Sequence, residues 1–149
     1  MVADCVFCGI VAGSVPAFMV ASSPSGVAFL DIRPVFLGHV LIVPRPHVVQ
    51  LIDLPSDDLP GYFGFVQAIA AAVPAALGSQ GTFVAQNNIV SQSVPHLHTH
   101  VVPRTKGDGL RGFFWPRRRY EDDDQALDFA TRIGNEYRSL SVAEGGRRE

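Results

Sequence analysis

The sequence contains little cysteine, little tryptophan and few charges. Its 149 residues include two cysteines and one tryptophan, and charged residues make up 17%. Two cysteines cannot form the disulfide framework of a small secreted domain, so we expect both thiols to be reduced. A formal net charge of −2 gives no electrostatic basis for binding duplex nucleic acid, and we expect no partner of that class.

The sequence pattern also predicts no targeting segment and no membrane-spanning segment. The first residues, Met1-Val2-Ala3-Asp4, lack the basic region and the apolar stretch of a signal peptide. The most apolar run, Gly61 to Leu77, is interrupted by Gln67 and Pro74, and we expect it to be too short to span a bilayer. These features predict a cytoplasmic protein with no membrane contact.

What the chain does contain is enough apolar sequence for one hydrophobic core. Apolar residues make up 47% of it, which suits a single domain over residues 1–149 with a frayed tail from about residue 141 to 149. Strands are predicted at 27–32, 39–43, 82–86 and around 96–102, and helices just after Cys5, after the Asp53–Asp58 cluster up to Leu77, and after Asp122–Asp124. The predicted fold class is α+β, an antiparallel sheet with two main helices.

Three of the five histidines alternate along one of these strands, Val94-Pro95-His96-Leu97-His98-Thr99-His100-Val101-Val102-Pro103-Arg104. Alternate side chains of a strand share a face, so the three imidazoles should form a row with Cα atoms roughly 6–7 Å apart. A single histidine on an apolar strand is usually a satisfied core or surface residue. Three in alternation cost packing and desolvation, and they indicate a metal site or a reaction centre.

The two cysteines are spaced as Cys5-Val6-Phe7-Cys8. A Cys-x-x-Cys turn supplies two of the four ligands of a structural zinc, and His47 and His96 are candidates for the other two. Two alternatives stay open, a pair of ordinary small residues in a helical turn and a redox pair.

The middle histidine of the row, His98, is the candidate nucleophile, because a neutral imidazole with one free ring nitrogen can attack phosphorus. His100 and His39 could bind phosphate oxygens or assist the leaving group. Hydroxyl and amide groups just upstream, including Gln92 and Ser93, could surround a non-bridging oxygen, or they could belong to a solvated loop. Asp31 ends an apolar strand, where it is either a turn carboxylate or an acceptor for the hydroxyls of a ribose.

These segments together resemble the histidine-triad (HIT) superfamily of nucleotide hydrolases and transferases, from about Cys5 to Arg104. The segment His96-Leu97-His98-Thr99-His100-Val101-Val102 fits the family's His-φ-His-φ-His-φ-φ signature, in which φ is apolar and Thr99 is the least apolar φ. Two further blocks of the family match Leu30-Asp31-Ile32-Arg33-Pro34 and the stretch from Gly38 to His47.

The resemblance implies a homodimer with a sheet continuous across both subunits. Phe63 lies off the apolar stripe of its predicted helix, so it is either simply exposed or part of a subunit interface. It implies attack by His98 on the α-phosphorus of a purine nucleotide, such as an AMP conjugate, through a nucleotidyl-histidine intermediate resolved by water. Asp31 would hold the ribose. It also implies a purine pocket lined by Val6, Phe7, Ile10, Phe29 and Ile32, and a structural zinc on Cys5, Cys8, His47 and His96.

The chain departs from the family pattern at three places. Ser91 stands where the family has glycine, the loop after Gln86 is a residue shorter, and Pro95 replaces a bulky residue before the first histidine. Asn88, or Asn87 beside it, corresponds to the family's phosphate-contacting asparagine. These departures bear on substrate preference more than on reaction type.

Three functions are consistent with the sequence. The first is a nucleoside phosphoramidase or dinucleoside polyphosphate hydrolase. The second is a nucleotide-binding or signalling module of the same fold with negligible turnover, although an intact His98 argues against it. The third is a metal-storage or redox protein, which would have no nucleotide affinity. Stabilisation by AMP would distinguish the third from the other two.

Overall fold

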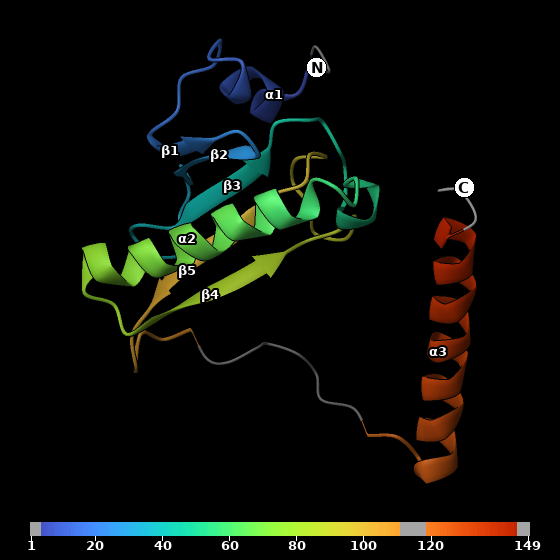
Figure 1. Cartoon of the computed structure of the whole chain (residues 1–149). Coiled ribbons are helices and arrows are strands. Elements are labelled where there is room, and N and C mark those ends of the chain that lie inside the picture. The colour runs from blue at the N-terminus through green and yellow to red at the C-terminus, as the bar shows by residue number, and fades with distance from the viewer. Residues whose placement is uncertain (1–3, 111–118, 146–149) are drawn as a thin grey trace. The chain divides into compact units, whose positions relative to one another are not determined.

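The computed structural model describes residues 4–110 and 119–145, and the chain divides into two compact units, Met1–Gly109 and Leu110–Glu149 (Figure 1). The first unit holds a five-stranded sheet whose described pairings are all antiparallel, in the order β1-β2-β3-β5-β4. Its elements in chain order are α1 (Val6–Val11), β1 (Met19–Ser23), β2 (Gly26–Leu30), β3 (Val40–Pro44), the 3-10 turn η1 (Leu51–Asp53), α2 (Leu59–Leu77), β4 (Gly81–Gln86) and β5 (Thr99–Arg104). The predicted α+β fold with an antiparallel sheet is therefore confirmed.

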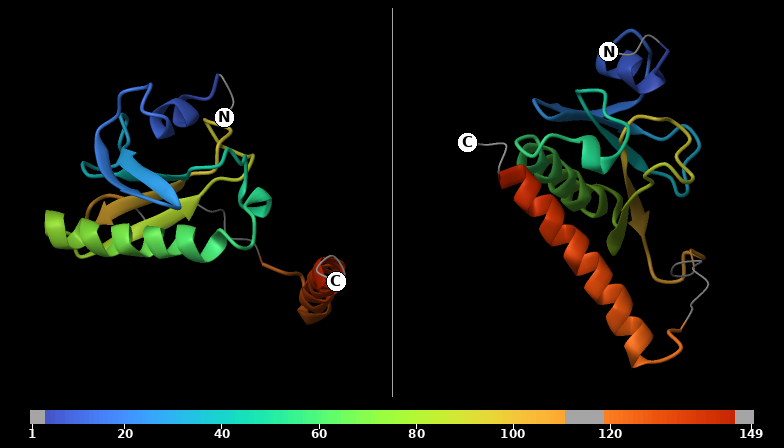
Figure 2. Two further views of the ribbon diagram at one scale, coloured as in Figure 1. Left: turned by 45° about the horizontal axis from the view of Figure 1, so that its top comes forward. Right: turned by 90° about the vertical axis from the view of Figure 1, so that its right-hand side faces the viewer.

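Helices cover the two faces of this sheet: α1 lies on one face and α2 on the other (Figure 2). Alternating residues of the central strands divide between two cores. Ala28, Val40, Ile42 and Val101 face α2, together with Leu97 just before β5, and Val27, Phe29, Leu41 and Val43 face Phe7 of α1. Strands β2 and β3 are buried on both faces, which explains their continuous apolar sequences.

Helix α2 has clear start and stop signals. Pro60 lies in its first turn and Gly78, in the left-handed conformation at φ 68°, ends it by donating to Pro74 O. The buried side chains Tyr62, Val66, Ile69 and Val73 recur at helical spacing and pack on the sheet. By length and composition this helix could cross a membrane, so the expectation that the run is too short was wrong. Its apolar stripe packs against the core strands of the unit instead.

Two strands differ from the sequence prediction. Strand β1 was missed because it is a short edge strand whose residues are mostly exposed, so it has no clear apolar alternation. The histidine strand begins later than expected: β5 starts at Thr99, and His96 and His98 lie in the segment just before it. Pro95 cannot donate a ladder hydrogen bond, which is consistent with pairing that starts further along the chain.

The second unit consists mainly of α3 (Asp123–Gly145), which begins within the predicted acidic cluster. Leu127, Phe129 and Ile133 are exposed on it. The helix continues beyond residue 141, where the frayed tail was expected to begin, and residues 146–149 lie outside the described residues. That residues 1–149 act as a single domain stays a prediction.

Candidate active site and metal centre

The histidine row faces α1, although only its last member lies in a strand. His98 and His100 have ring centroids 5.0 Å apart, and Phe7 of α1 lies edge-on to His98 at 5.3 Å. His96 lies 6.1 Å from the same Phe7 ring. His39, just before β3, joins the row because its ring centroid is 5.1 Å from that of His100. The tertiary structure thus brings all three predicted catalytic histidines together.

One ring nitrogen of His98 is committed to the backbone. Its Nδ1 lies 2.7 Å from His96 O, and because a carbonyl can only accept, Nδ1 carries the proton. The tautomer of a neutral imidazole is set by such a bond, and Nε2 of His98 is left with a free lone pair. This is the state that nucleophilic attack requires.

His39 and His100 form a directed pair. The amide of Val35 donates to His39 Nδ1 at 3.3 Å, so His39 carries its proton on Nε2 and donates it to His100 Nδ1 at 3.0 Å. His100 then has its own proton on Nε2. This nitrogen is buried and has no hydrogen-bond partner among the described residues, so the site holds one unused donor next to His98.

Both of these imidazoles are neutral at pH 7. Burial lowers the pKa of His39, an effect that the nearby carboxylate of Asp31 opposes. Burial, reinforced by electrostatic interaction with the neighbouring His98 and His39 rings, lowers the pKa of His100 to about 4. Although Asp31 Oδ2 lies 3.4 Å from His39 Nδ1, this contact is therefore not an ion pair at neutral pH.

A cavity of about 500 Å³ opens beside His98 and His100, a size typical of small-molecule sites. The predicted residues Val6, Phe7, Ile10, Phe29, Asp31, Ile32 and Ser93 all line it. Leu30, Arg33, Leu41, Val94 and residues 15–17 line it as well. Most of these residues are apolar, and the sequence did not identify them because an apolar residue that lines a cavity has the same local pattern as one in a core.

Two predicted substrate contacts, Asn88 and Gln92, do not line this cavity. Asn88 Oδ1 accepts from the amide of Leu51 at 2.7 Å, and Gln92 Nε2 donates to Val49 O at 2.6 Å. Both side chains therefore tie the loop before the histidines to the segment around η1. In the same loop Ser91, which replaces the family's glycine, has φ 61°, the left-handed region that glycine adopts without strain. A contact of Asn88 or Gln92 with substrate stays a prediction.

The predicted metal ligands converge at the N-terminal end of α1, where Cys5 is the N-cap and Cys8 lies in the first turn. The ligand atoms of Cys5, Cys8, His47 and His96 all lie within 4.8 Å of one another. Cys8 Sγ lies 3.2 Å from His47 Nδ1 and 3.7 Å from His96 Nδ1, and Cys5 Sγ lies 3.5 Å from His96 Nδ1. With usual Zn–S and Zn–N lengths and tetrahedral angles, adjacent sulfur and nitrogen ligands lie roughly 3.5 Å apart.

The protonation of His96 also suits a metal ligand. Its Nε2 lies 3.1 Å from Pro44 O and must donate to it, so the Nδ1 lone pair points toward the two thiols. A backbone carbonyl behind a metal-binding histidine commonly fixes the ring in this way. Cys5 caps α1, and the Cys8 amide donates to its sulfur. The donor set therefore fits zinc in chemistry and in spacing.

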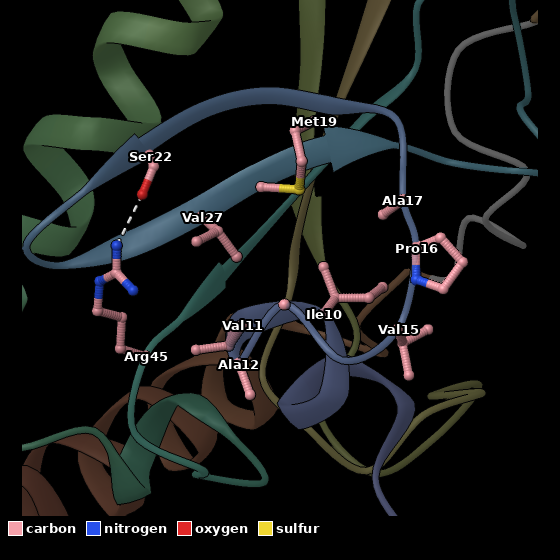
Figure 3. Close-up of a pocket in the computed structure, with 11 residues that line it drawn as sticks. Ile10, Val11, Ala12, Val15, Pro16, Ala17, Met19, Ser22, Val27 and Arg45 are labelled. Atoms are coloured by element: carbon pink, nitrogen blue, oxygen red, sulfur yellow. Dashed lines mark hydrogen bonds between the residues drawn. The ribbon is translucent and has the colours of Figure 1, made fainter.

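A second cavity, of about 400 Å³, lies between α1 and the β1–β2 hairpin (Figure 3). It shares Ile10 and residues 15–17 with the first cavity. Its charged lining residue, Arg45, donates to Ser22 Oγ at 2.7 Å and to Ser23 O at 2.8 Å. No histidine, cysteine or carboxylate among the described residues lines it, so of these two cavities the first is the one that holds candidate catalytic side chains.

Comparison with known proteins agrees with the family resemblance of the sequence. Residues 12–107 match the model of the HIT domain family. An uncharacterised HIT-like protein of Mycobacterium tuberculosis is 40% identical over 108 residues, which is 71% of this chain and 75% of that protein. The adenosine 5'-monophosphoramidase of Schizosaccharomyces pombe is 32% identical over 115 residues, 76% of this chain and 84% of that protein. A zinc-bound histidine triad family protein of Mycobacterium smegmatis, 38% identical, has a similar structure with a TM-score of 0.68, covering 80% of this chain and 84% of that one.

Proposed function

Because this chain belongs to the HIT family, we propose that it is a hydrolase that cleaves purine nucleotide conjugates at the α-phosphorus, with His98 as the nucleophile. The observation that carries the proposal is the bond from His98 Nδ1 to His96 O, which leaves Nε2 free beside the 500 Å³ cavity. Phosphoramidates and dinucleoside polyphosphates are the two substrate classes, and the phosphoramidase activity named for the yeast relative favours the first.

The reaction has two steps. Nε2 of His98 forms a bond to the α-phosphorus while the bond from phosphorus to the leaving group breaks, giving nucleotidyl-His98. The leaving group takes up a proton from solvent as it departs. Water then attacks the same phosphorus and releases a proton, the P–N bond to His98 breaks, and AMP leaves with the imidazole neutral again, so that protons balance over the two steps. The buried Nε2–H of His100 is the donor for a phosphoryl or leaving-group oxygen or nitrogen, and His39 holds His100 in the tautomer that provides it.

The nucleoside part of the substrate occupies the apolar half of the cavity. The aromatic pair Phe7 and Phe29, with ring centroids 5.4 Å apart, offers a surface for the purine, together with Val6, Ile10 and Ile32. Asp31 has one carboxylate oxygen engaged by the Arg33 amide at 2.8 Å. Its other oxygen faces the neutral His39 and can accept from the ribose hydroxyls.

We propose in addition that Cys5, Cys8, His47 and His96 hold a structural zinc and that the protein is a homodimer. Zinc bound there would cross-link α1 to His47, which follows β3, and to His96, the first member of the histidine row. Reduced thiols are consistent with a cytoplasmic location. For the dimer, the edge strand β4 is a surface that a second copy can extend. Val84 on β4 and Phe63 on α2 are both exposed apolar residues.

The direct test is turnover of adenosine 5'-phosphoramidate and of a diadenosine polyphosphate by wild type and by His98→Asn. The variant should lose at least about a thousandfold in kcat while keeping its Tm and its stabilisation by AMP. The ratio of the two wild-type rates identifies the leaving-group class. Stabilisation by AMP without turnover would instead favour the binding module. That alternative is consistent with the hydrogen bonds of Asn88 and Gln92 to Leu51 and Val49, which hold the two side chains away from the cavity.

A further inference from the structure

Directly behind the histidine row, on the α2 face of the sheet, lies a buried polar chain. Thr99 stands between His98 and His100 in the sequence, at a position where the family signature has an apolar residue, and its side chain is fully buried. Its hydroxyl lies 2.6 Å from Gln86 Nε2 on β4 and 2.8 Å from the hydroxyl of Tyr62 on α2. The Tyr62 hydroxyl continues the chain to Ile42 O on β3, at 3.0 Å.

The direction of every bond in this chain is determined. Ile42 O can only accept, so the Tyr62 O–H donates to it, and the Thr99 O–H therefore donates to Tyr62. The amide of Gln86 donates to Thr99. Burial raises the pKa of Tyr62 to about 12, which keeps its proton in place. A buried network in which each donor has an acceptor is rigid and specifies one arrangement of its elements.

The chain coincides with the point where the sheet fixes the register of β5. Thr99 is the first residue of β5 to pair with either neighbour, opposite Ile42 on β3 and opposite Gln86 on β4. The hydroxyl of Thr99 therefore contacts its β4 partner directly and reaches its β3 partner through Tyr62. A slip of one residue would turn His100 to the α2 face, and it would break both of these connections.

His98 immediately precedes this point. It lies outside the ladder, and its backbone is held between the paired Thr99 and the bond from its own ring to His96 O. The position of Nε2 relative to a bound phosphorus thus depends on how firmly Thr99 is held. Errors of about 1 Å in such a position can lower the rate by roughly a hundredfold.

We propose that Thr99, Tyr62 and Gln86 are positioning residues for the reaction at His98: their hydrogen-bond chain fixes the register at which the histidine row is presented to the cavity. The expected effect on kcat rests on the proposed function. The ordering of His98 by Thr99 is independent of that function.

The test replaces Thr99 with valine, which has the same shape and lacks the hydroxyl. Thr99→Ser keeps the hydroxyl, and Thr82→Val on β4 is the matched control, because the Thr82 hydroxyl has no hydrogen bond among the described residues. With adenosine 5'-phosphoramidate, Thr99→Val should lose about tenfold in kcat with KM within about twofold of wild type. Thr99→Ser and Thr82→Val should keep the wild-type kcat.

A lower Tm in Thr99→Val with an unchanged kcat would overturn the proposal, since the hydroxyl would then only stabilise the fold. If Thr99→Val does not fold, Gln86→Met takes its place, because it removes only the first donor and leaves the Tyr62 bonds intact. Loss of kcat in that variant supports the proposal, and a wild-type kcat overturns it.

Absence of turnover in wild type would count against the proposed function and not against this inference. In that case the exchange rate of the His98 ring Nδ1–H, measured by NMR without substrate, decides. We expect it to be about tenfold faster in Thr99→Val than in wild type and in Thr82→Val. An unchanged rate overturns the proposal.

Discussion

His98 donates its Nδ1 proton to the backbone carbonyl of His96 over 2.7 Å. The ring of His96 has its Nδ1 3.5 Å from Cys5 Sγ and its Nε2 3.1 Å from Pro44 O. One short segment therefore connects the candidate metal site to the candidate nucleophile. A group bound to the Cys/His cluster would steady the carbonyl that sets the tautomer of His98.

The first prediction concerns the metal. Protein produced with zinc should contain one equivalent, and a chelator should lower Tm by about 10 °C, because an ion that binds only the folded state stabilises it. A cavity of about 460 Å³ that reaches Cys5 and His47 gives the chelator access. Cys8→Ser should contain little metal and should show no response to the chelator. Metal-free wild type with an unchanged Tm would contradict the prediction.

The second prediction concerns the pair of His39 and His100. His39→Gln and His100→Asn should each lower kcat by roughly tenfold to a hundredfold, because the first loses the partner of His100 Nδ1 and the second loses the buried Nε2–H donor. The double variant should be little worse than His100→Asn alone, since the two residues act as one unit. Multiplicative losses in a steady-state double-mutant cycle would show that they act separately.

The third prediction concerns the ribose. Asp31→Asn keeps the shape of the side chain and removes its charge, and it should weaken AMP binding by roughly tenfold to a hundredfold, because hydrogen bonds to charged groups contribute about 1.5–3 kcal/mol. Dideoxy-AMP is the control ligand. In calorimetric titrations it should bind wild type and Asp31→Asn equally weakly. If it distinguishes the two proteins as strongly as AMP does, the carboxylate acts elsewhere.

The fourth prediction concerns pH. The pKa of His100 is lowered to about 4 and that of His39 is also lowered, so between pH 6.5 and about 4 the unfolded chain binds more protons than the folded one. The free energy of unfolding should therefore fall as the pH decreases through this window. His100→Asn should show a shallower decrease in urea titrations at pH 7, 5.5 and 4.5, and its metal ligands are unchanged. Equal slopes in the two proteins would exclude His100 as a source.

The fifth prediction concerns the dimer. Val84 on β4 and Val20 on β1 are similarly exposed, at 45% and 47%, on opposite edges of the sheet. A lysine on an edge strand opposes strand pairing between copies. Val84→Lys should shift sedimentation equilibrium toward monomer, and Val20→Lys should not. The reverse result would place the interface at β1, and a wild-type protein that is monomeric would exclude the homodimer.

Much of the fold was predictable from local sequence. The buried strands β2 and β3 are continuous apolar runs, and α2 combines a helical stripe with Pro60 and Gly78 at its ends. Strand β1 was not predictable, because an exposed edge strand has little apolar alternation. The start of β5 at Thr99 was not predictable either, since it depends on where two neighbouring strands can pair with it.

By itself the sequence determined which residues are candidates for the chemistry: the alternation of His96, His98 and His100 and the Cys-x-x-Cys turn are visible without coordinates. Only the tertiary structure decided what each side chain does there. In the folded protein Asn88 and Gln92 hold a loop, and His100 has a buried Nε2–H with no acceptor among the described residues. Thr99 belongs to a hydrogen-bond chain across β3, β5 and β4. The reason is physical: spacing along a chain sets the side of a strand on which a residue lies, whereas hydrogen-bond partners and tautomers are set by groups distant in sequence that only folding brings together.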